Sequence, residues 1–128
     1  MSQEDKQLLF KDLCARLPYG VKLQRNNVYD SSKKEIEFLT LQGFQDIENH
    51  NSIELLNIKP YLRPMSSMTE EEVDEWAKAS NMKFDMEDGF FDCYDAHLSV
   101  DWLNAHHFDY RGLIEKGLAI EAPEGMYN

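Results

Sequence analysis

Residues 9–24, "LFKDLCARLPYGVKLQ", decide the fold class, because the spacing of apolar residues changes within this stretch. Before the turn sequence Pro18-Tyr19-Gly20, apolar residues recur every three or four positions, which is the period of a helix. After the turn they alternate through Val21 and Leu23, which is the period of a strand. We therefore predict a helix over residues 1–18 and a sheet that begins directly after it.

The predicted helix has a cap and an apolar stripe. Ser2 is placed to cap it, with the acid Asp5 at the reciprocal position of a capping box. The stripe consists of Leu9, Leu13 and Leu17, with Phe10 and Cys14 beside them. We expect the three leucines to pack against the sheet and interpret Cys14 as a buried, structural thiol.

The alternating pattern continues over residues 20–64, interrupted by sequences rich in Asn, Asp and Ser that are typical of turns. Ile36, Phe38 and Ile58 are expected to face the helix together with Val21. At the usual strand length this region holds about three to five short strands. We predict a small, curved antiparallel β-meander or partly open barrel, ended by "KPYLRP" because proline cannot donate to a ladder.

Residues 65–128 are predicted to be mainly helical. Thr69 and Glu72 form a capping box at the start of a surface helix of about ten residues. Ser99 is placed to begin a second helix, and Asp109 a short third one that Gly117 ends in a left-handed conformation. The whole chain is thus predicted to be one α+β domain, 1–128.

Composition fits a folded, cytoplasmic protein. Of the 128 residues 42% are hydrophobic, and seven Phe, six Tyr and two Trp are present, more than a disordered chain carries. The N-terminal sequence has no basic segment followed by an apolar run, and no stretch approaches the ~20 apolar residues of a membrane span. We therefore expect Cys14 and Cys93 to be free, reduced thiols.

The net charge of −11 is unevenly distributed. Residues 1–64 carry nine acids and nine bases, whereas residues 70–95 carry ten acids against Lys78 and Lys83. This distribution argues against direct binding of nucleic acid and against docking on anionic lipid, since both need clustered bases. We interpret the acidic strip as a solvated face, with a basic partner protein or mimicry of DNA as alternatives. The interaction candidates are Glu70, Glu71, Asp74, Glu75 and Arg111, although Arg111 is also placed to pair with Glu115.

The stretch "AHHFDYRGL" raises the question of a metal site. Cys93, His97 and Asp101 recur every four residues and would share one face of a continuous helix, to which His106 or His107 would add a fourth zinc ligand. No CxxC or HExxH spacing supports this set, however, and adjacent histidines point in different directions on a helix. We favour a structural interpretation in which "WLNAHHFDYRGLI" is a packing unit with one histidine buried and the other exposed.

Three stretches carry a family resemblance. They are "LCARLPYGVK", "IKPYLRPMSSMTEEE" and "DWLNAHHFDYRGLIEKGLAIEAPEGMY". Together, over about half of the chain, they resemble a family of small uncharacterised proteins of gut Bacteroides-type bacteria and of their phages and mobile elements. The resemblance implies a bacterial cytosolic or phage-encoded origin, and it carries no activity or site residues.

Three function classes follow from the sequence. The first is a non-enzymatic interaction or accessory module that offers its curved sheet or acidic helix to another protein and needs no cofactor. The second is an acidic DNA mimic or inhibitor of a host factor. The third is a metal- or thiol-dependent enzyme around Cys93, His97 and His106 or His107. A shallow exposed apolar patch would favour the first class.

Overall fold

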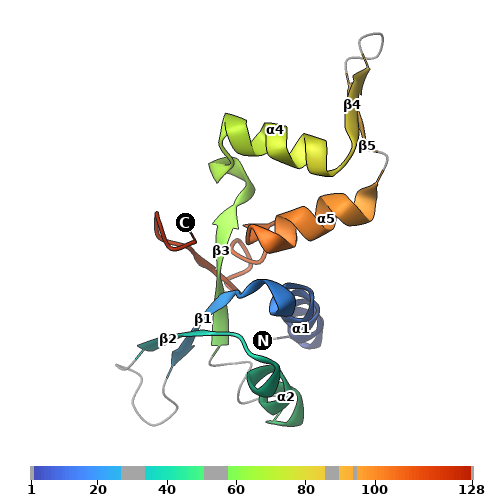
Figure 1. The fold of residues 1–128 in the computed structure, drawn as a ribbon. Coiled ribbons are helices and arrows are strands. Elements are labelled where there is room, and N and C mark those ends of the chain that lie inside the picture. The colour runs from blue at the N-terminus through green and yellow to red at the C-terminus, as the bar shows by residue number, and fades with distance from the viewer. Residues whose placement is uncertain (1, 27–33, 51–57, 86–89, 94, 128) are drawn as a thin grey trace.

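The structure is a computed structural model that describes residues 2–26, 34–50, 58–85, 90–93 and 95–127. The chain combines helices with strands (Figure 1), so the predicted α+β class is confirmed. None of the described helices combines the length and hydropathy that crossing a membrane requires. The elements are α1 (Gln3–Arg16), β1 (Lys22–Asn26), β2 (Lys34–Phe38), α2 (Leu41–His50), β3 (Ile58–Pro64), α4 (Glu70–Ala79), β4 (Met82–Asp85), β5 (Phe90–Cys93), α5 (Ala96–Ala105), β6 (Phe108–Asp109) and β7 (Ile120–Glu121).

The N-terminal helix begins and ends as the sequence predicts. Ser2 Oγ accepts a hydrogen bond from the backbone N–H of Asp5 at 3.0 Å, which caps α1. Leu9 and Leu13 are fully buried. After a short 3₁₀ turn the chain reverses at Gly20, whose φ of 72° is a left-handed conformation that glycine adopts without steric cost.

Over the described residues, the sheet is mixed, has five strands and is not closed into a barrel. β1 pairs antiparallel with β2 and β3, whereas β3 pairs parallel with β6 and β7. The strand order β2-β1-β3-β6 places β1 between β2 and β3, so the predicted meander is wrong. The reason is that the chain leaves β2 at the edge, passes through α2 and returns on the other side of β1.

A helix, α2, occupies a stretch for which alternation predicts a continued strand. The strand ends at Phe38, and Thr40 Oγ1 accepts a hydrogen bond from the Gly43 N–H at 3.0 Å, as an N-cap residue does. Phe44 then packs edge-to-face on Phe10 of α1, with ring centroids 5.1 Å apart. The cap and this aromatic contact therefore override a short alternating pattern.

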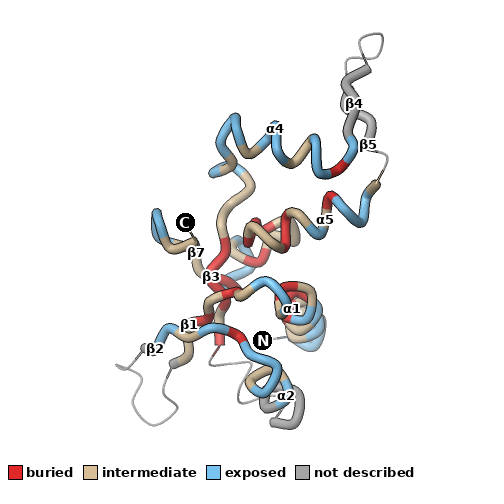
Figure 2. Tube along the Cα trace, in the orientation of Figure 1, coloured by how far each residue is buried: buried red, intermediate tan, exposed pale blue. Residues whose placement is uncertain are grey.

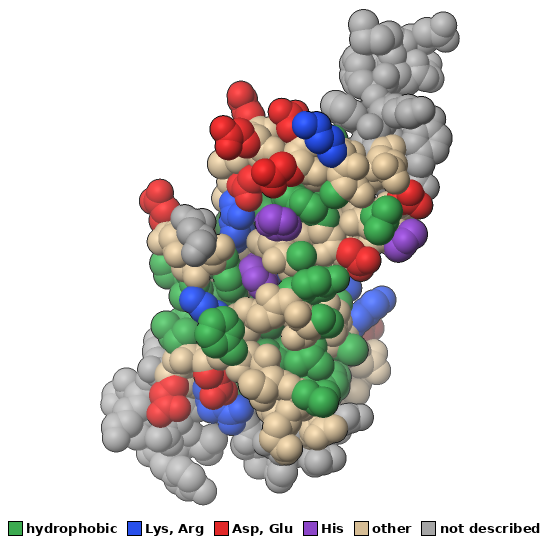
Figure 3. All heavy atoms as spheres, in the orientation of Figure 1, with side chains coloured by type: hydrophobic (Ala, Val, Ile, Leu, Met, Phe, Trp, Pro, Cys, Tyr) green, Lys and Arg blue, Asp and Glu red, His purple; other side chains and the backbone are tan. Residues whose placement is uncertain are grey.

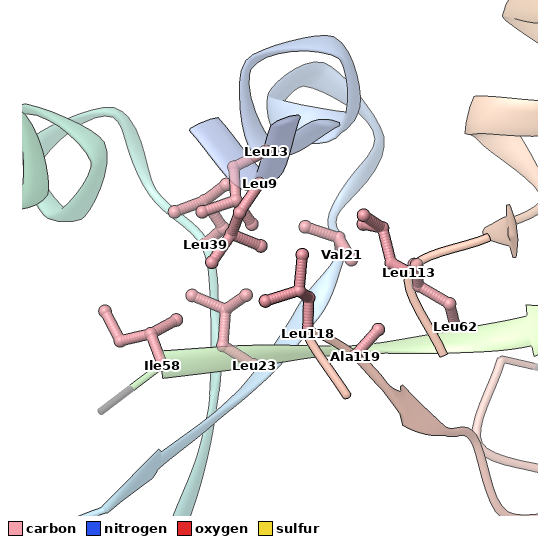
Figure 4. Close-up of a cluster of buried hydrophobic side chains, with 10 residues drawn as sticks. All are labelled: Leu9, Leu13, Val21, Leu23, Leu39, Ile58, Leu62, Leu113, Leu118 and Ala119. Carbon is pink, nitrogen blue, oxygen red and sulfur yellow. The ribbon is translucent and has the colours of Figure 1, made fainter. Parts of the chain in front are cut away.

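One face of the sheet is covered by α1 and carries the hydrophobic core (Figures 2 and 4). Val21 and Ile58 lie in this core, as predicted. Ile36 and Phe38 were expected beside them but are 58% and 60% exposed, because β2 directs them to the face that α1 does not cover. The buried cluster consists of Leu9, Leu13, Val21, Leu23, Leu39, Ile58, Leu62, Leu113, Leu118 and Ala119.

Pro60 lies inside β3 and does not end the sheet. The Leu39 N–H donates to the Val21 carbonyl at 2.9 Å, so these two residues form a hydrogen-bonded pair between β2 and β1. Hydrogen-bonded and non-bonded pairs alternate along an antiparallel ladder. The next bonded pair is therefore Leu23 with Glu37, and the backbone N–H and C=O of Leu23 point towards β2. Pro60 is the partner of Leu23 on the other side, at a position where β3 makes no hydrogen bond to β1. The missing N–H is therefore tolerated, and the strand continues to Pro64.

The two helices of the second half pack on each other (Figure 1). α4 begins at the predicted capping box: Thr69 Oγ1 accepts from the Glu72 N–H at 3.2 Å, and the Glu72 carboxylate accepts from the Thr69 N–H at 3.1 Å. α5 begins upstream of Ser99, so the predicted start is wrong. Ser99 is buried instead and accepts a hydrogen bond from Trp76 Nε1 at 2.9 Å. The β4–β5 hairpin between them was not part of the mainly helical prediction.

Turns replace the predicted last helix over residues 110–117. The Asp109 carboxylate accepts hydrogen bonds from the N–H groups of Leu113 and Ile114, at 2.9 and 3.0 Å. These donors lie four and five residues after Asp109, further than the two or three of an N-cap, so the carboxylate closes a wide turn. Gly117 has the predicted left-handed conformation, with a φ of 74°.

Candidate interaction site

The face of the sheet opposite α1 carries exposed apolar side chains on its edge strand, β2. Ile36 and Phe38 lie on this face and alternate with Glu35 and Glu37. Lys22 of β1 is the cross-strand partner of Phe38, and its Nζ lies 5.3 Å from the centroid of the Phe38 ring. The site therefore starts from two exposed apolar side chains and one cation.

Tyr127 holds the C-terminal segment against the same face. Its hydroxyl donates to the Tyr61 carbonyl at 2.6 Å and accepts from the Lys22 N–H at 2.9 Å. Lys22 Nζ also donates to the Met126 carbonyl at 3.0 Å. Burial raises the pKa of Tyr127 to about 12, so the hydroxyl remains protonated and able to donate at physiological pH. The segment is thereby fixed as a wall beside β2.

A pocket lies on each side of β2. The first, of about 530 Å³, is on the open face and is lined by residues of β1 and β2 and by residues 123–126. The second, of about 450 Å³, lies beside the start of α2 and includes Arg25, Thr40 and Gln42 in its lining. Glu37 and Phe38 line both pockets, so the edge strand forms the ridge between them.

The acidic residues of β2 give its other face a polar character. Glu37 Oε1 lies 2.8 Å from Arg25 Nε, and both side chains are partly exposed. Glu35 is the cross-strand partner of Arg25 and is exposed. Two carboxylates thus lie beside one guanidinium on this face.

His107 lies behind the C-terminal wall. Its ring stacks on Tyr127 with centroids 3.8 Å apart, and the residue is only 6% exposed. Burial, followed by the positive charge of Arg16, lowers the pKa of His107 to about 4, so it is neutral at physiological pH. Its φ of 63° is left-handed, which reverses the chain between α5 and β6.

The histidine pair forms part of a packing corner, as predicted. His106 is half-buried and stacks on Trp102 at 4.0 Å, and Trp102 stacks in turn on the buried Phe108 at 5.8 Å. His106 is less exposed than expected, and the two histidines contact different rings. No described group hydrogen-bonds Nδ1 of the buried His107.

The described side chains of the metal hypothesis are not gathered at one point. His97 and Asp101 are exposed on α5, while His106 and His107 stack on different aromatic rings. The side chain of Cys93 lies outside the described residues. Within the described part of the chain, no three His, Cys, Asp or Glu side chains are placed to hold a metal ion.

The acidic interaction candidates lie together on α4. Figure 3 shows acidic side chains gathered over this helix, and the four candidates are all exposed: Glu70, Glu71, Asp74 and Glu75. The fifth candidate, Arg111, lies elsewhere. Its Nη1 donates to Asp12 Oδ1 at 2.7 Å, so the expected local pair with Glu115 is wrong.

α1 carries a buried ion cluster that the sequence pattern does not predict. Asp12 and Arg16 are fully buried, with Arg16 Nε 2.9 Å from Asp12 Oδ2. Arg16 Nη2 donates to the Phe108 carbonyl at 2.6 Å, which ties α1 to β6. The buried face of α1 therefore includes Asp12 and Arg16. Cys14 lies outside this face and is exposed, contrary to its interpretation as a buried thiol.

The sequence contained part of the signal for the open-face site. "KEIEF" alternates apolar and acidic residues, which shows that Ile36 and Phe38 share a face but not whether another element covers it. Tyr127 had no such signal, because its role depends on a contact with Lys22, far away in the sequence.

Comparisons of the chain with protein-family models, with curated proteins and with solved structures found no match.

Proposed function

We propose that the protein is a non-enzymatic interaction or accessory module that binds a partner protein through β2 and the pocket on the open face of the sheet. The observation that carries the proposal is the exposure of Ile36 and Phe38 on an edge strand, next to a pocket whose far wall is fixed by Tyr127. Exposed apolar side chains grouped around a concavity are typical of a binding surface.

The chemistry of the pocket supports a protein partner. Ile36, Phe38 and Met126 offer apolar contact, while Lys22 and Glu124 add charges of opposite sign to its lining. Interaction sites combine apolar and polar contacts in this way. A bacterial cytosolic or phage-encoded origin, implied by the family resemblance, is part of the same proposal.

Selection from a phage-displayed peptide library tests the proposed function. The double variant Ile36→Thr, Phe38→Thr removes the apolar patch, and Val73→Thr on α4 is the control because Val73 is also an exposed apolar residue, at 41%. We expect peptides that bind the wild type and the control but lose affinity for the double variant. Selections that give the same peptides for all three proteins, or none for any, would contradict the proposal.

The acidic helix supports a second candidate function, mimicry of DNA or of another anionic ligand. The observation that supports this candidate is the group of four exposed carboxylates on α4. The two candidates are separated by replacing those residues with Gln or Asn. Binding through β2 should persist in this variant, whereas binding of a basic partner by mimicry should be lost.

A further inference from the structure

The outer edge of β2 presents backbone groups with which no strand of the described residues pairs. The Leu39 N–H donates a hydrogen bond to β1. Because bonded pairs alternate along the ladder, the backbone N–H and C=O of Glu37 also point towards β1. The N–H and C=O groups of Ile36 and Phe38 therefore point away from β1, towards an edge with which no strand of the described residues pairs. Such an edge is a template for a further strand.

The pockets on the two sides of β2 match the geometry of an added strand. Successive side chains of a strand point to opposite faces of the sheet, so an added strand would direct alternate residues to the two sides of β2. Ile36 and Phe38 lie on one side, and the polar residues Arg25 and Gln42 line the pocket on the other. In strand addition the backbone supplies affinity and such pockets supply specificity.

Charge indicates the chemistry of the added strand. On the open face, apolar residues would meet Ile36 and Phe38. On the other face, residues of the added strand would lie beside two carboxylates, those of Glu35 and Glu37, and one guanidinium, that of Arg25, a set that favours basic side chains. A second copy of this chain fits poorly, because antiparallel pairing of two β2 strands about Ile36 would place Glu35 opposite Glu37.

We propose that the edge of β2 binds an extended segment of another protein in which basic residues alternate with apolar ones, adding a strand to the sheet. The inference rests on the proposed function and specifies both the binding mode and the class of partner.

A synthetic peptide in which lysine alternates with valine or phenylalanine is the probe. Its controls are a peptide of the same composition in scrambled order, one with glutamate in place of lysine, and one N-methylated at alternate residues. We expect the alternating peptide to bind the full chain and each control peptide to bind at least about tenfold more weakly. The double variant Ile36→Thr, Phe38→Thr should lose binding to a similar extent, and Glu35→Lys should weaken it about two- to fivefold.

Amide hydrogen exchange distinguishes strand addition from apolar docking. The amides of Ile36 and Phe38 face the free edge and should become protected when the alternating peptide binds, whereas that of Leu39 is already bonded to Val21. Binding that depends on Ile36 and Phe38 without new protection of their amides would overturn strand addition and leave the proposed function intact. Equal binding of all the peptides, no binding of the alternating peptide, or dimerisation of the wild type that the double variant abolishes would overturn the inferred partner.

Discussion

The alternating strands place apolar side chains on both faces of the sheet, and the two faces differ in what covers these side chains. On the covered face, Leu23 and Ile58 meet Leu9 and Leu13 of α1 and are excluded from water. On the open face, the C-terminal segment reaches the middle of the sheet through Tyr127 but leaves the apolar residues of β2 exposed. The difference shows that the element packed across a strand, rather than its own pattern, decides whether its apolar residues form a core or stay exposed.

The largest expected effect is the loss of Asp12 on the covered side. Asp12→Ala leaves the buried guanidinium of Arg16 without its carboxylate partner and removes a partner of Arg111. We expect the free energy of unfolding in urea to fall by about 3–5 kcal/mol. The matched control is Glu37→Ala, which breaks the partly exposed pair with Arg25 and should cost less than about 1 kcal/mol. Equal losses would show that the two ion pairs do not differ as their burial implies.

Leu13→Ala tests the apolar part of the covered face. Leu13 is fully buried in the cluster between α1 and the sheet, so its truncation should destabilise the protein by about 2–5 kcal/mol. Leu41→Ala is the control, because Leu41 is 63% exposed at the start of α2 and should change stability by about 0.5 kcal/mol or less. A small effect of Leu13→Ala in urea denaturation would mean that α1 does not cover the sheet as described.

His107 makes the stability depend on pH. Its pKa is lowered from 6.5 to about 4 in the folded protein, so below pH 6.5 the unfolded chain binds a proton that the folded chain does not. The stability that neutral His107 provides is fully present above pH 6.5 and is lost as the pH falls towards 4, by an amount on the order of 2–3 kcal/mol. His107→Asn retains a residue that tolerates the left-handed backbone but does not titrate. Urea denaturation across this range should give a shallower pH profile for the variant, and an equally steep one would contradict the assignment to His107.

Local signals in the sequence predict the ends of the elements well. The Ser2 cap, the turn at Gly20 and the box of Thr69 and Glu72 all depend on neighbours within a few residues, and the structure contains them all. The start of α5 is the exception: Ser99 resembles a cap, but its hydroxyl accepts from Trp76 across the contact between two helices.

Contacts between residues far apart in the sequence are harder to predict, and the candidate site depends on them. Burial of Asp12 and Arg16 requires contacts with β6 and with Arg111, which no helical pattern reveals. The exposure of Phe38 follows from the position of β2 at the sheet edge, and strand order is not encoded in alternation. The core leucines could therefore be predicted, whereas the exposed apolar face of β2 could not.

Tyr127→Phe tests the hydroxyl contacts that hold the C-terminal segment on the open face. The substitution removes a hydroxyl that bridges the Tyr61 carbonyl and the Lys22 N–H while it keeps the ring that stacks on His107. We expect a loss of about 1–2 kcal/mol in the free energy of unfolding and faster hydrogen exchange at the Lys22 amide. Unchanged exchange at that amide would show that the hydroxyl does not hold the wall of the pocket.

Phe38→Thr should have a small effect on stability and a clear consequence for binding. Phe38 is 60% exposed, and its described ring contact is with Lys22 Nζ, so its removal should cost less than about 1 kcal/mol. Threonine also suits an edge strand, which limits any loss from β propensity. The same substitution removes the largest apolar side chain from the proposed binding surface, so affinity for a partner should fall while the protein remains folded. If urea denaturation instead showed a loss comparable to that of Leu13→Ala, Phe38 would be part of a core, and the open face would not be available for binding.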